Sequence, residues 1–166
     1  KSNPTLFEWA ASPIVYMETE FASQFRNVMN TYFSTKKSLY HYISMAEGNY
    51  REFLRGANVK AKKYFYVMRP VLACRWILEK GTPPPMRFTE LMAAELPENL
   101  LPELEHLLEL KMNAPEIKEI PRIDVLNEYL DTSITEIKNL LLDMDDTKKM
   151  EWEILNQMFL KFISVN

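Results

Sequence analysis

The feature that most constrains this chain is a stretch of forty residues, Ser38 to Ile77, in which apolar residues recur at helical spacing on both sides of one break. The break lies at residues 55–58, where Gly56 can take a positive φ without a Cβ penalty and so end a helix. The first half carries its apolar residues on one side. The second half is apolar nearly all round from Tyr64 to Leu78, which indicates a buried helix. The stretch therefore predicts a central pair of helices.

Positive charge is concentrated in the same region. Between Lys36 and Arg75 the chain has nine Lys or Arg and two acids, a net charge of +7, whereas the total is −3. Residues 88–166 have seven bases and seventeen acids, a net charge of −10. Arg69 and Arg75 lie between apolar neighbours, and burying an unpaired arginine costs several kcal/mol. Each must therefore contact either an acid of the same chain or an anionic ligand, and the sequence leaves both open.

The rest of the chain also has helical periodicity. Further helices are predicted at residues 5–11, with Asn3 as the N-cap, and at residues 18–32, 88–96, 100–112, 123–141 and 152–162. The last two, with a turn at Met144 to Thr147, are expected to form an antiparallel pair. No alternating apolar segment is long enough to indicate a sheet. The predicted fold class is all-α: a multi-helix bundle with a central buried helix pair and a C-terminal helical hairpin.

The composition fits one domain. At 166 residues and 47% apolar content the chain can bury a full core, so residues 1–166 are predicted to form a single helical domain. The proline-rich connector at residues 81–85 offers an alternative boundary, between residues 1–80 and 86–166. The lone cysteine allows no internal disulfide, and no window of 18 uncharged apolar residues could span a membrane. We expect a cytoplasmic protein with no membrane partner. The start, Lys1-Ser2-Asn3-Pro4, has no initiator methionine, so we interpret the chain as a piece of a longer protein.

The sequence Asp143-Met144-Asp145-Asp146 is the arrangement that most suggests a metal site. Two aspartates one residue apart on a strand face the same side, but at a helix end they diverge by about 200°. The motif also lacks the glycine and distal glutamate of a calcium loop. We therefore expect no metal site in this chain, and expect Asp145 or Asp146 to cap the last helix.

The histidines and the cysteine offer no obvious catalytic set. His106 stands among glutamates and is expected at the surface, whereas His41, on the polar side of the first central helix, is open to a surface role or to ligand contact. Cys74 is expected to be a small packed residue and not a nucleophile. Five tyrosines could stack on a nucleotide base, although core packing is favoured for them: Tyr40, Tyr42, Tyr50, Tyr64 and Tyr66.

Several motifs in a fixed order resemble one known family. They are NPTLFEWAASPIVY at residues 3–16, HYISMAEGNYREFLRG at 41–56, VKAKKYFYVMRPVLACRWI at 59–77 and PPPMRF at 83–88. These strings resemble the predicted nucleotidyltransferases of the DNA polymerase beta superfamily, including members in bacterial RNA-repair clusters. The resemblance is close over residues 1 to about 92, and from Glu95 onward it rests on helical character.

The resemblance implies that this chain is the helical C-terminal part of such an enzyme. In the family, a Gly-Ser turn and paired aspartates hold Mg²⁺ in an N-terminal α/β domain, and no Gly-Ser dipeptide occurs here. The chain alone is therefore expected to be inactive and to bind no metal, with Mg²⁺ held by the absent catalytic domain. The intact enzyme would transfer a nucleotidyl group from a nucleoside triphosphate to a hydroxyl, for which RNA is a candidate acceptor.

The helical domain would then form the second wall of the substrate cleft. We predict seven binding residues there: His41, Asn49, Arg51, Lys62, Lys63, Arg69 and Arg75. The lysines and arginines would hold phosphate, whereas His41 or Asn49 would orient base or sugar. The expected partners are a nucleoside triphosphate, RNA and the protein's own N-terminal catalytic domain.

Two alternatives belong to other classes. A non-catalytic module could dock RNA or a protein on the basic face, and its RNA affinity would depend steeply on salt. An apolar surface left bare by the absent domain could instead form a homodimer.

Overall fold

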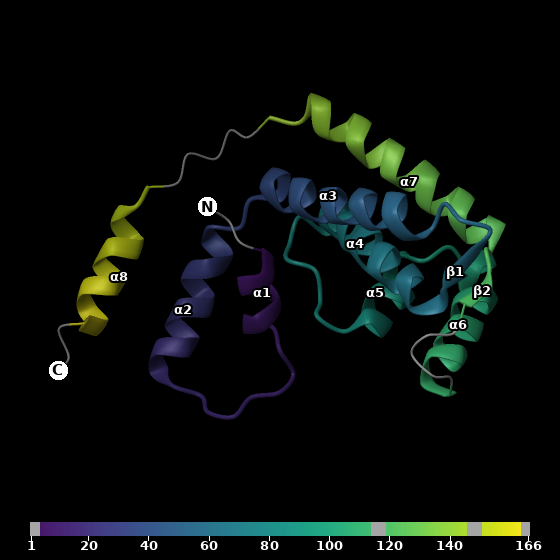
Figure 1. Cartoon of the computed structure of the whole chain (residues 1–166). Helices are drawn as coiled ribbons and strands as arrows, with labels where there is room; N and C mark the ends of the chain where they lie inside the picture. Colours follow the sequence, from purple (N-terminus) through teal and green to yellow (C-terminus); the bar gives the residue numbers. More distant parts are fainter. Residues whose placement is uncertain (1–3, 114–118, 146–150, 164–166) are drawn as a thin grey trace.

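The computed structural model describes residues 4–113, 119–145 and 151–163 and is predominantly helical (Figure 1), which confirms the predicted all-α class. The predicted N-cap Asn3 lies outside these residues. The elements in chain order are α1 (Pro4–Ala10), α2 (Glu20–Thr31), α3 (Thr35–Phe53), β1 (Asn58–Lys60), α4 (Ala61–Lys80), α5 (Phe88–Glu95), the 3₁₀ turn η1 (Glu98–Leu100), α6 (Leu101–Asn113), β2 (Glu119–Pro121), α7 (Asp124–Asp143) and α8 (Glu153–Ile163).

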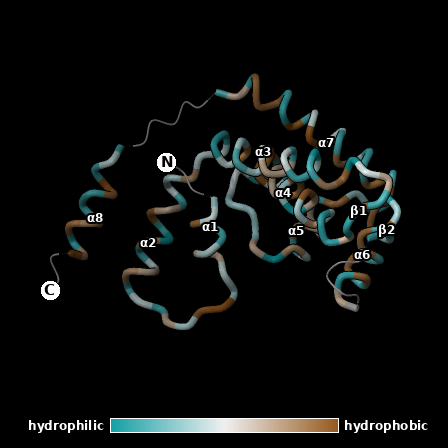
Figure 2. Tube along the Cα trace, in the orientation of Figure 1, coloured by the Kyte–Doolittle hydropathy of each residue, from teal (hydrophilic) through white to brown (hydrophobic). Residues whose placement is uncertain are grey.

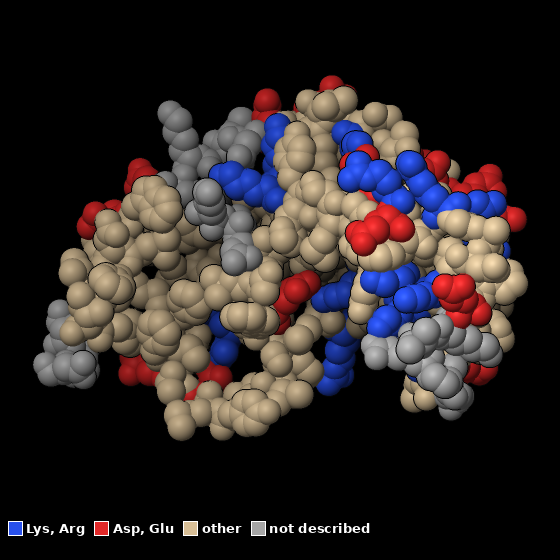
Figure 3. All heavy atoms as spheres, in the orientation of Figure 1, with Lys and Arg blue, Asp and Glu red and all other residues tan. Residues whose placement is uncertain are grey.

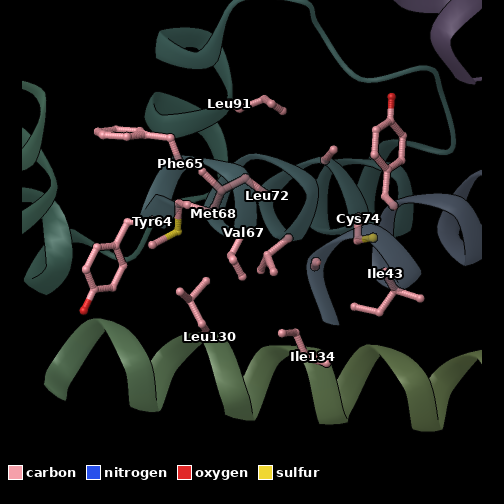
Figure 4. Close-up of a cluster of buried hydrophobic side chains, with 14 of the residues drawn as sticks. Ile43, Tyr64, Phe65, Val67, Met68, Leu72, Cys74, Leu91, Leu130 and Ile134 are labelled. Carbon is pink, nitrogen blue, oxygen red and sulfur yellow. The ribbon is translucent and has the colours of Figure 1, made fainter. Parts of the chain in front are cut away.

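Helix α4 is the centre of the molecule. It lies beside α3 and also packs against α5, α6 and α7 (Figure 1). Its side chains point to several neighbours at once. Val67 faces Leu130 of α7 (Figure 4). Phe65 packs edge-on against Phe88 of α5, with ring centroids 5.5 Å apart. A helix covered on all sides needs apolar residues on all sides, which explains its nearly continuous apolar sequence.

A buried polar network joins three of these helices. The side-chain amide of Asn127 in α7 donates to the carbonyl oxygen of Leu54 at the end of α3 (2.7 Å). Tyr64 of α4 donates its hydroxyl hydrogen to Asn127 Oδ1 (2.7 Å) and accepts from the backbone N–H of Ile123 (2.8 Å). Because buried polar groups must be paired, these bonds specify how α7 sits on the central pair.

The break between α3 and α4 differs from the expectation. Gly56 does not have a positive φ; among the described residues only Gly81, at φ 65°, does, and it ends α4. After Gly56 the chain forms β1, which pairs antiparallel with β2, so that Val59 lies opposite Ile120. Three-residue strands are too short for an alternating pattern to reveal them, which is why the sequence indicated no sheet.

The predicted C-terminal hairpin is wrong. Helix α8 does not fold back on α7 but lies beside α2 (Figure 1). The rings of Phe21 and Phe162 meet edge to face, with centroids 4.6 Å apart, and Lys161 donates to the Gln24 side chain (3.1 Å). Periodicity identified both helices but could not show which surface α8 would meet. Residues 146–150, which include part of the predicted turn, lie outside the described residues.

Apolar side chains remain exposed at the α1–α2 end of the molecule. The loop after α1 carries Ile14 to Met17, with Tyr16 97% exposed, and α8 has no buried residue (Figure 2). Clusters of exposed apolar side chains are typical of surfaces that contact another chain or domain. Within the described ranges, no helix combines the length and apolar character needed to cross a bilayer.

Candidate functional site

Arg69 is held by an acid that sequence reasoning missed. Its Nη2 donates to Glu8 Oε1 of α1 at 2.9 Å, and the Tyr42 hydroxyl of α3 donates to the same oxygen at 2.9 Å. Burial and the neighbouring Glu8 carboxylate raise the pKa of Tyr42 well above its usual range. The second terminal nitrogen of Arg69, Nη1, is buried without a hydrogen-bond partner. The cluster ties α1 to the central helix pair.

Arg75 contacts α7, whereas Arg69 contacts α1. Its Nη2 donates to Ser133 Oγ at 2.8 Å and lies 3.4 Å from Glu136 Oε2. The guanidinium carbon is 5.4 Å from the ring centroid of Tyr129, and burial raises the pKa of that tyrosine although Arg75 opposes the shift. The Nε of Arg75 is buried and unpaired. The side chain forms part of the wall of a pocket of about 320 Å³ between α4, η1 and α7.

A third group of cations lies where α3 ends and α4 begins. We call it the junction patch: Arg51, Arg55, Lys60, Lys62 and Lys63. Arg51, Arg55 and Lys60 are exposed and make no ion pair with any residue that the structure describes, whereas Lys62 is half-buried and has an interaction. Blue atoms gather over this end of the molecule in Figure 3.

Aromatic rings accompany these cations. The Lys63 ammonium lies 3.4 Å from the ring centroid of Phe53 and 4.9 Å from that of Tyr66. The Tyr66 side chain is 47% exposed, so one face of the patch offers an accessible ring beside positive charge. This combination suits nucleic-acid binding, in which bases stack and cations meet phosphate.

His41 and Asn49, two further predicted binding residues, also lie on α3. His41 is exposed, and its ring meets Tyr42 edge to face at 5.5 Å. Asn49 is half-buried and donates its side-chain amide to the Met45 carbonyl oxygen at 2.8 Å. His41 is ten residues before Arg51, which is about 15 Å along a helix.

The structure thus divides the seven predicted binding residues. Arg51, Lys62 and Lys63 lie on the segments that meet where α3 ends and α4 begins, whereas Arg69 contacts α1 and Arg75 contacts α7. Both arginines take the internal ion pair that the sequence left open, although their side chains remain 28% and 33% exposed. A role of these residues in nucleotide binding stays a prediction.

Other candidate residues take structural or surface positions. Cys74 is buried, with a pKa raised by burial, and His106 is exposed, as expected. The predicted capping of the last helix is wrong for Asp145, because α8 begins at Glu153; Asp146 lies outside the described residues. In the described part of the chain, no group of three or more His, Cys, Asp or Glu could hold a metal ion.

Sequence reasoning missed Glu8, Tyr129 and Ser133. Glu8 is 61 positions before Arg69, and Ser133 is 58 positions after Arg75. Each lies on a helix with an ordinary amphipathic pattern, so no local signal marks it as an arginine partner. The one available hint was the need of each buried arginine for a partner.

Comparison with known proteins finds one family model and one curated relative that match nearly the whole chain. A family model described as "RlaP: RNA repair pathway DNA polymerase beta family" matches residues 1–161. The chain is 43% identical over 165 residues to the uncharacterized protein YcgL of Bacillus subtilis (strain 168), covering 98% of this chain and 64% of that protein. The chain therefore spans about two thirds of the length of this relative. No solved structure matches the present chain.

Proposed function

The chain belongs to the RNA repair pathway DNA polymerase beta family, and on this premise we propose that it is the substrate-binding helical part of a nucleotidyltransferase. The enzyme would transfer a nucleotidyl group from a nucleoside triphosphate to a hydroxyl, with RNA as the acceptor. This chain would serve as the C-terminal domain and hold the nucleic acid or nucleotide, while an N-terminal catalytic domain outside it would carry out the chemistry.

The junction patch is the observation that supports this proposal. Arg51 and Arg55 are exposed cations without an ion pair in the described structure, and Tyr66 adds an accessible ring beside Lys63. Unpaired surface cations attract phosphate because they release counterions on binding and need break no internal pair. Arg69 and Arg75, which already contact acids, would contribute less to phosphate binding.

Among the described residues, no group of three or more His, Cys, Asp or Glu could hold a metal ion. We propose that Mg²⁺ binds to the catalytic domain, and assign no step through the ion here. The chain incubated alone with RNA and labelled nucleoside triphosphates should transfer no label, and the longer protein that contains it should. Transfer by the chain alone would overturn this division of labour.

The binding role can be measured on the chain itself. A fluorescent single-stranded RNA of eight uridines should bind with an affinity that falls on the order of tenfold to a hundredfold between 50 and 200 mM salt. Replacing Arg51 and Arg55 with glutamine should weaken binding and flatten the logarithmic salt dependence by about 0.7 for each cation removed. The control is Arg87→Gln, which removes an exposed arginine that lies beside Glu90 and is not one of the patch residues.

The outcomes separate the alternatives. Unchanged binding by the double variant would remove the junction patch from the proposal. RNA binding by the chain combined with no transfer by the longer protein would favour the non-catalytic RNA-binding module. The exposed apolar surface around Ile14 to Met17 fits either the catalytic domain or a second copy of the chain. A monomer in light scattering would count against a homodimer.

A further inference from the structure

The pocket between α4, η1 and α7 has a mixed chemistry that phosphate binding does not explain. Its volume of about 320 Å³ is at the lower end of the range for small-molecule sites. Among the described residues that line it, Arg75 is the one basic residue, and Glu128 and Glu136 contribute carboxylates. A phosphate group would therefore meet two negative charges for each positive one, which disfavours an anion at this place.

The pocket instead offers separate hydrogen-bond donors and acceptors. The Arg75 guanidinium can only donate, and its side chain forms part of the pocket lining. Ionised carboxylates such as Glu128 and Glu136 can only accept. A ligand that satisfies both must carry acceptors and donors close together on one edge, and must have no negative charge there.

Tyr129 adds an aromatic surface to this wall. Its ring lies beside the Arg75 guanidinium, 5.4 Å from centroid to guanidinium carbon, and is part of the pocket lining. Aromatic rings and arginine planes are the surfaces on which unpaired nucleobases stack. The combination of a planar surface, a donor and acceptors is typical of base recognition.

We propose that this pocket binds a nucleobase, with guanine as the preferred base. The O6 of guanine can accept from the Arg75 guanidinium, while the N1–H and the amino group on the same edge can donate to Glu128 or Glu136. Uracil has a single N–H donor on the corresponding edge, between two acceptors, so it would satisfy the carboxylates less fully than guanine. The inference rests on the proposed function, since the base would come from the RNA whose phosphates contact the junction patch.

The spacing along α4 indicates that the base and those phosphates belong to different nucleotides. Lys63 and Arg75 are twelve residues apart on one helix, which is about 18 Å along its axis. This exceeds the separation of a base from its own 5′ phosphate. A strand of RNA could reach both places, whereas a mononucleotide could not.

The test compares two RNAs that differ in one base. The affinity of the chain for eight uridines is measured beside that for the same octamer with one central guanosine, by fluorescence anisotropy. The guanosine octamer should bind at least about fivefold more tightly, the lower end of the discrimination expected for one well-made base contact. Glu128→Gln and Glu136→Gln should remove most of this preference and leave the affinity for eight uridines unchanged or slightly higher.

The matched control neutralises one carboxylate, as the glutamate variants do, at a position outside the pocket lining. Asp131→Asn alters an exposed acid of the same helix that is not part of the pocket lining, and it should keep the guanosine preference. Both glutamates are exposed, so their amide variants should fold normally. The Arg75→Lys variant is less suitable, because its loss of hydrogen bonds to Ser133 could loosen the packing of α7.

A second measurement keeps the pocket and the RNA proposals distinguishable. Guanosine without phosphate is titrated while the backbone amide resonances of the pocket residues are followed by NMR. Equal binding of both octamers and no guanosine shifts would overturn the pocket proposal and leave RNA binding intact. Guanosine shifts at Tyr129 and Ser133 without binding of either octamer would support the pocket and overturn the RNA function. If neither octamer binds and guanosine causes no shifts, both the pocket proposal and the RNA-binding proposal are overturned.

Discussion

The two glycines of the central helix pair differ in backbone conformation, so replacing each with alanine should have opposite effects. Gly48 lies inside α3, and an added Cβ would meet no atom within 4 Å. Gly48→Ala should therefore stabilise the protein by about 0.5–1 kcal/mol, since alanine loses less entropy in a helix. Gly81 has a φ of 65°, and Gly81→Ala should cost about 1 kcal/mol. Urea unfolding measures both, and a shift of the same sign in the two variants would contradict the assigned conformations.

Asn127 is the residue whose side chain links α7 to both central helices. Asn127→Ala would leave the Leu54 carbonyl oxygen and the Tyr64 hydroxyl without this partner in a buried place. Each unsatisfied group costs about 1–3 kcal/mol, so the free energy of unfolding should fall by about 2–6 kcal/mol. Asn139→Ala, at an exposed position of the same helix, is the control and should change it by less than about 0.5 kcal/mol. Equal effects of the two would show that the network does not hold α7.

At the scale of elements, α8 is attached to the molecule by one face. Its contact with α2 includes the ring pair of Phe21 and Phe162, and none of its described side chains is fully buried. Phe162→Ala should release α8, so that its amides exchange with solvent faster by about tenfold or more while those of α4 keep their protection. Phe159→Ala removes a ring that is 64% exposed and should have little effect. The reverse ranking in hydrogen exchange would mean that α8 packs by its other face.

For the whole molecule, the buried tyrosines predict a loss of stability in alkali. Burial raises the pKa of four of the eight tyrosines: Tyr42, Tyr50, Tyr64 and Tyr129. In the unfolded chain these groups ionise near pH 10, so above that pH the folded state retains more protons than the unfolded state. The stabilisation is therefore complete below about pH 10 and is lost as the pH rises through the folded-state values.

The measurement follows tyrosinate absorbance and circular dichroism together as the pH is raised. The four tyrosines with a raised pKa should ionise only as helicity is lost. The unfolding free energy should fall less steeply with pH in the Tyr42→Phe variant, by up to about 1.4 kcal/mol per pH unit. Complete ionisation near pH 10 in a protein that keeps its helicity would contradict the burial of these hydroxyls.

The fold was largely predictable because helical periodicity is a local property. The buried character of α4 followed from apolar residues all round it, and the positions of α5, α6 and α7 followed from their spacing. The pairing of β1 with β2 was not predictable, since three residues give no periodic signal. The position of α8 beside α2 was also missed, because chain neighbours usually pair and here they do not.

The candidate site was predictable only in part. The cation-rich stretch was visible in the sequence, and so was the need of Arg69 and Arg75 for partners. The identity of those partners was not, because Glu8 and Ser133 resemble any other polar residue on an amphipathic helix. The ring of Tyr66 could equally have been buried, as that of Tyr64 is.

The sequence by itself determined where helices form and which one lies at the centre, because residue spacing along the chain sets both. It also determined that the middle of the chain is basic and the C-terminal part acidic. Only the tertiary structure decided that Arg69 reaches α1, that Arg75 helps line a pocket with α7, and that Arg51 and Arg55 stay unpaired among the described residues. The physical reason is that an ion pair depends on which surfaces meet, and distant packing settles that.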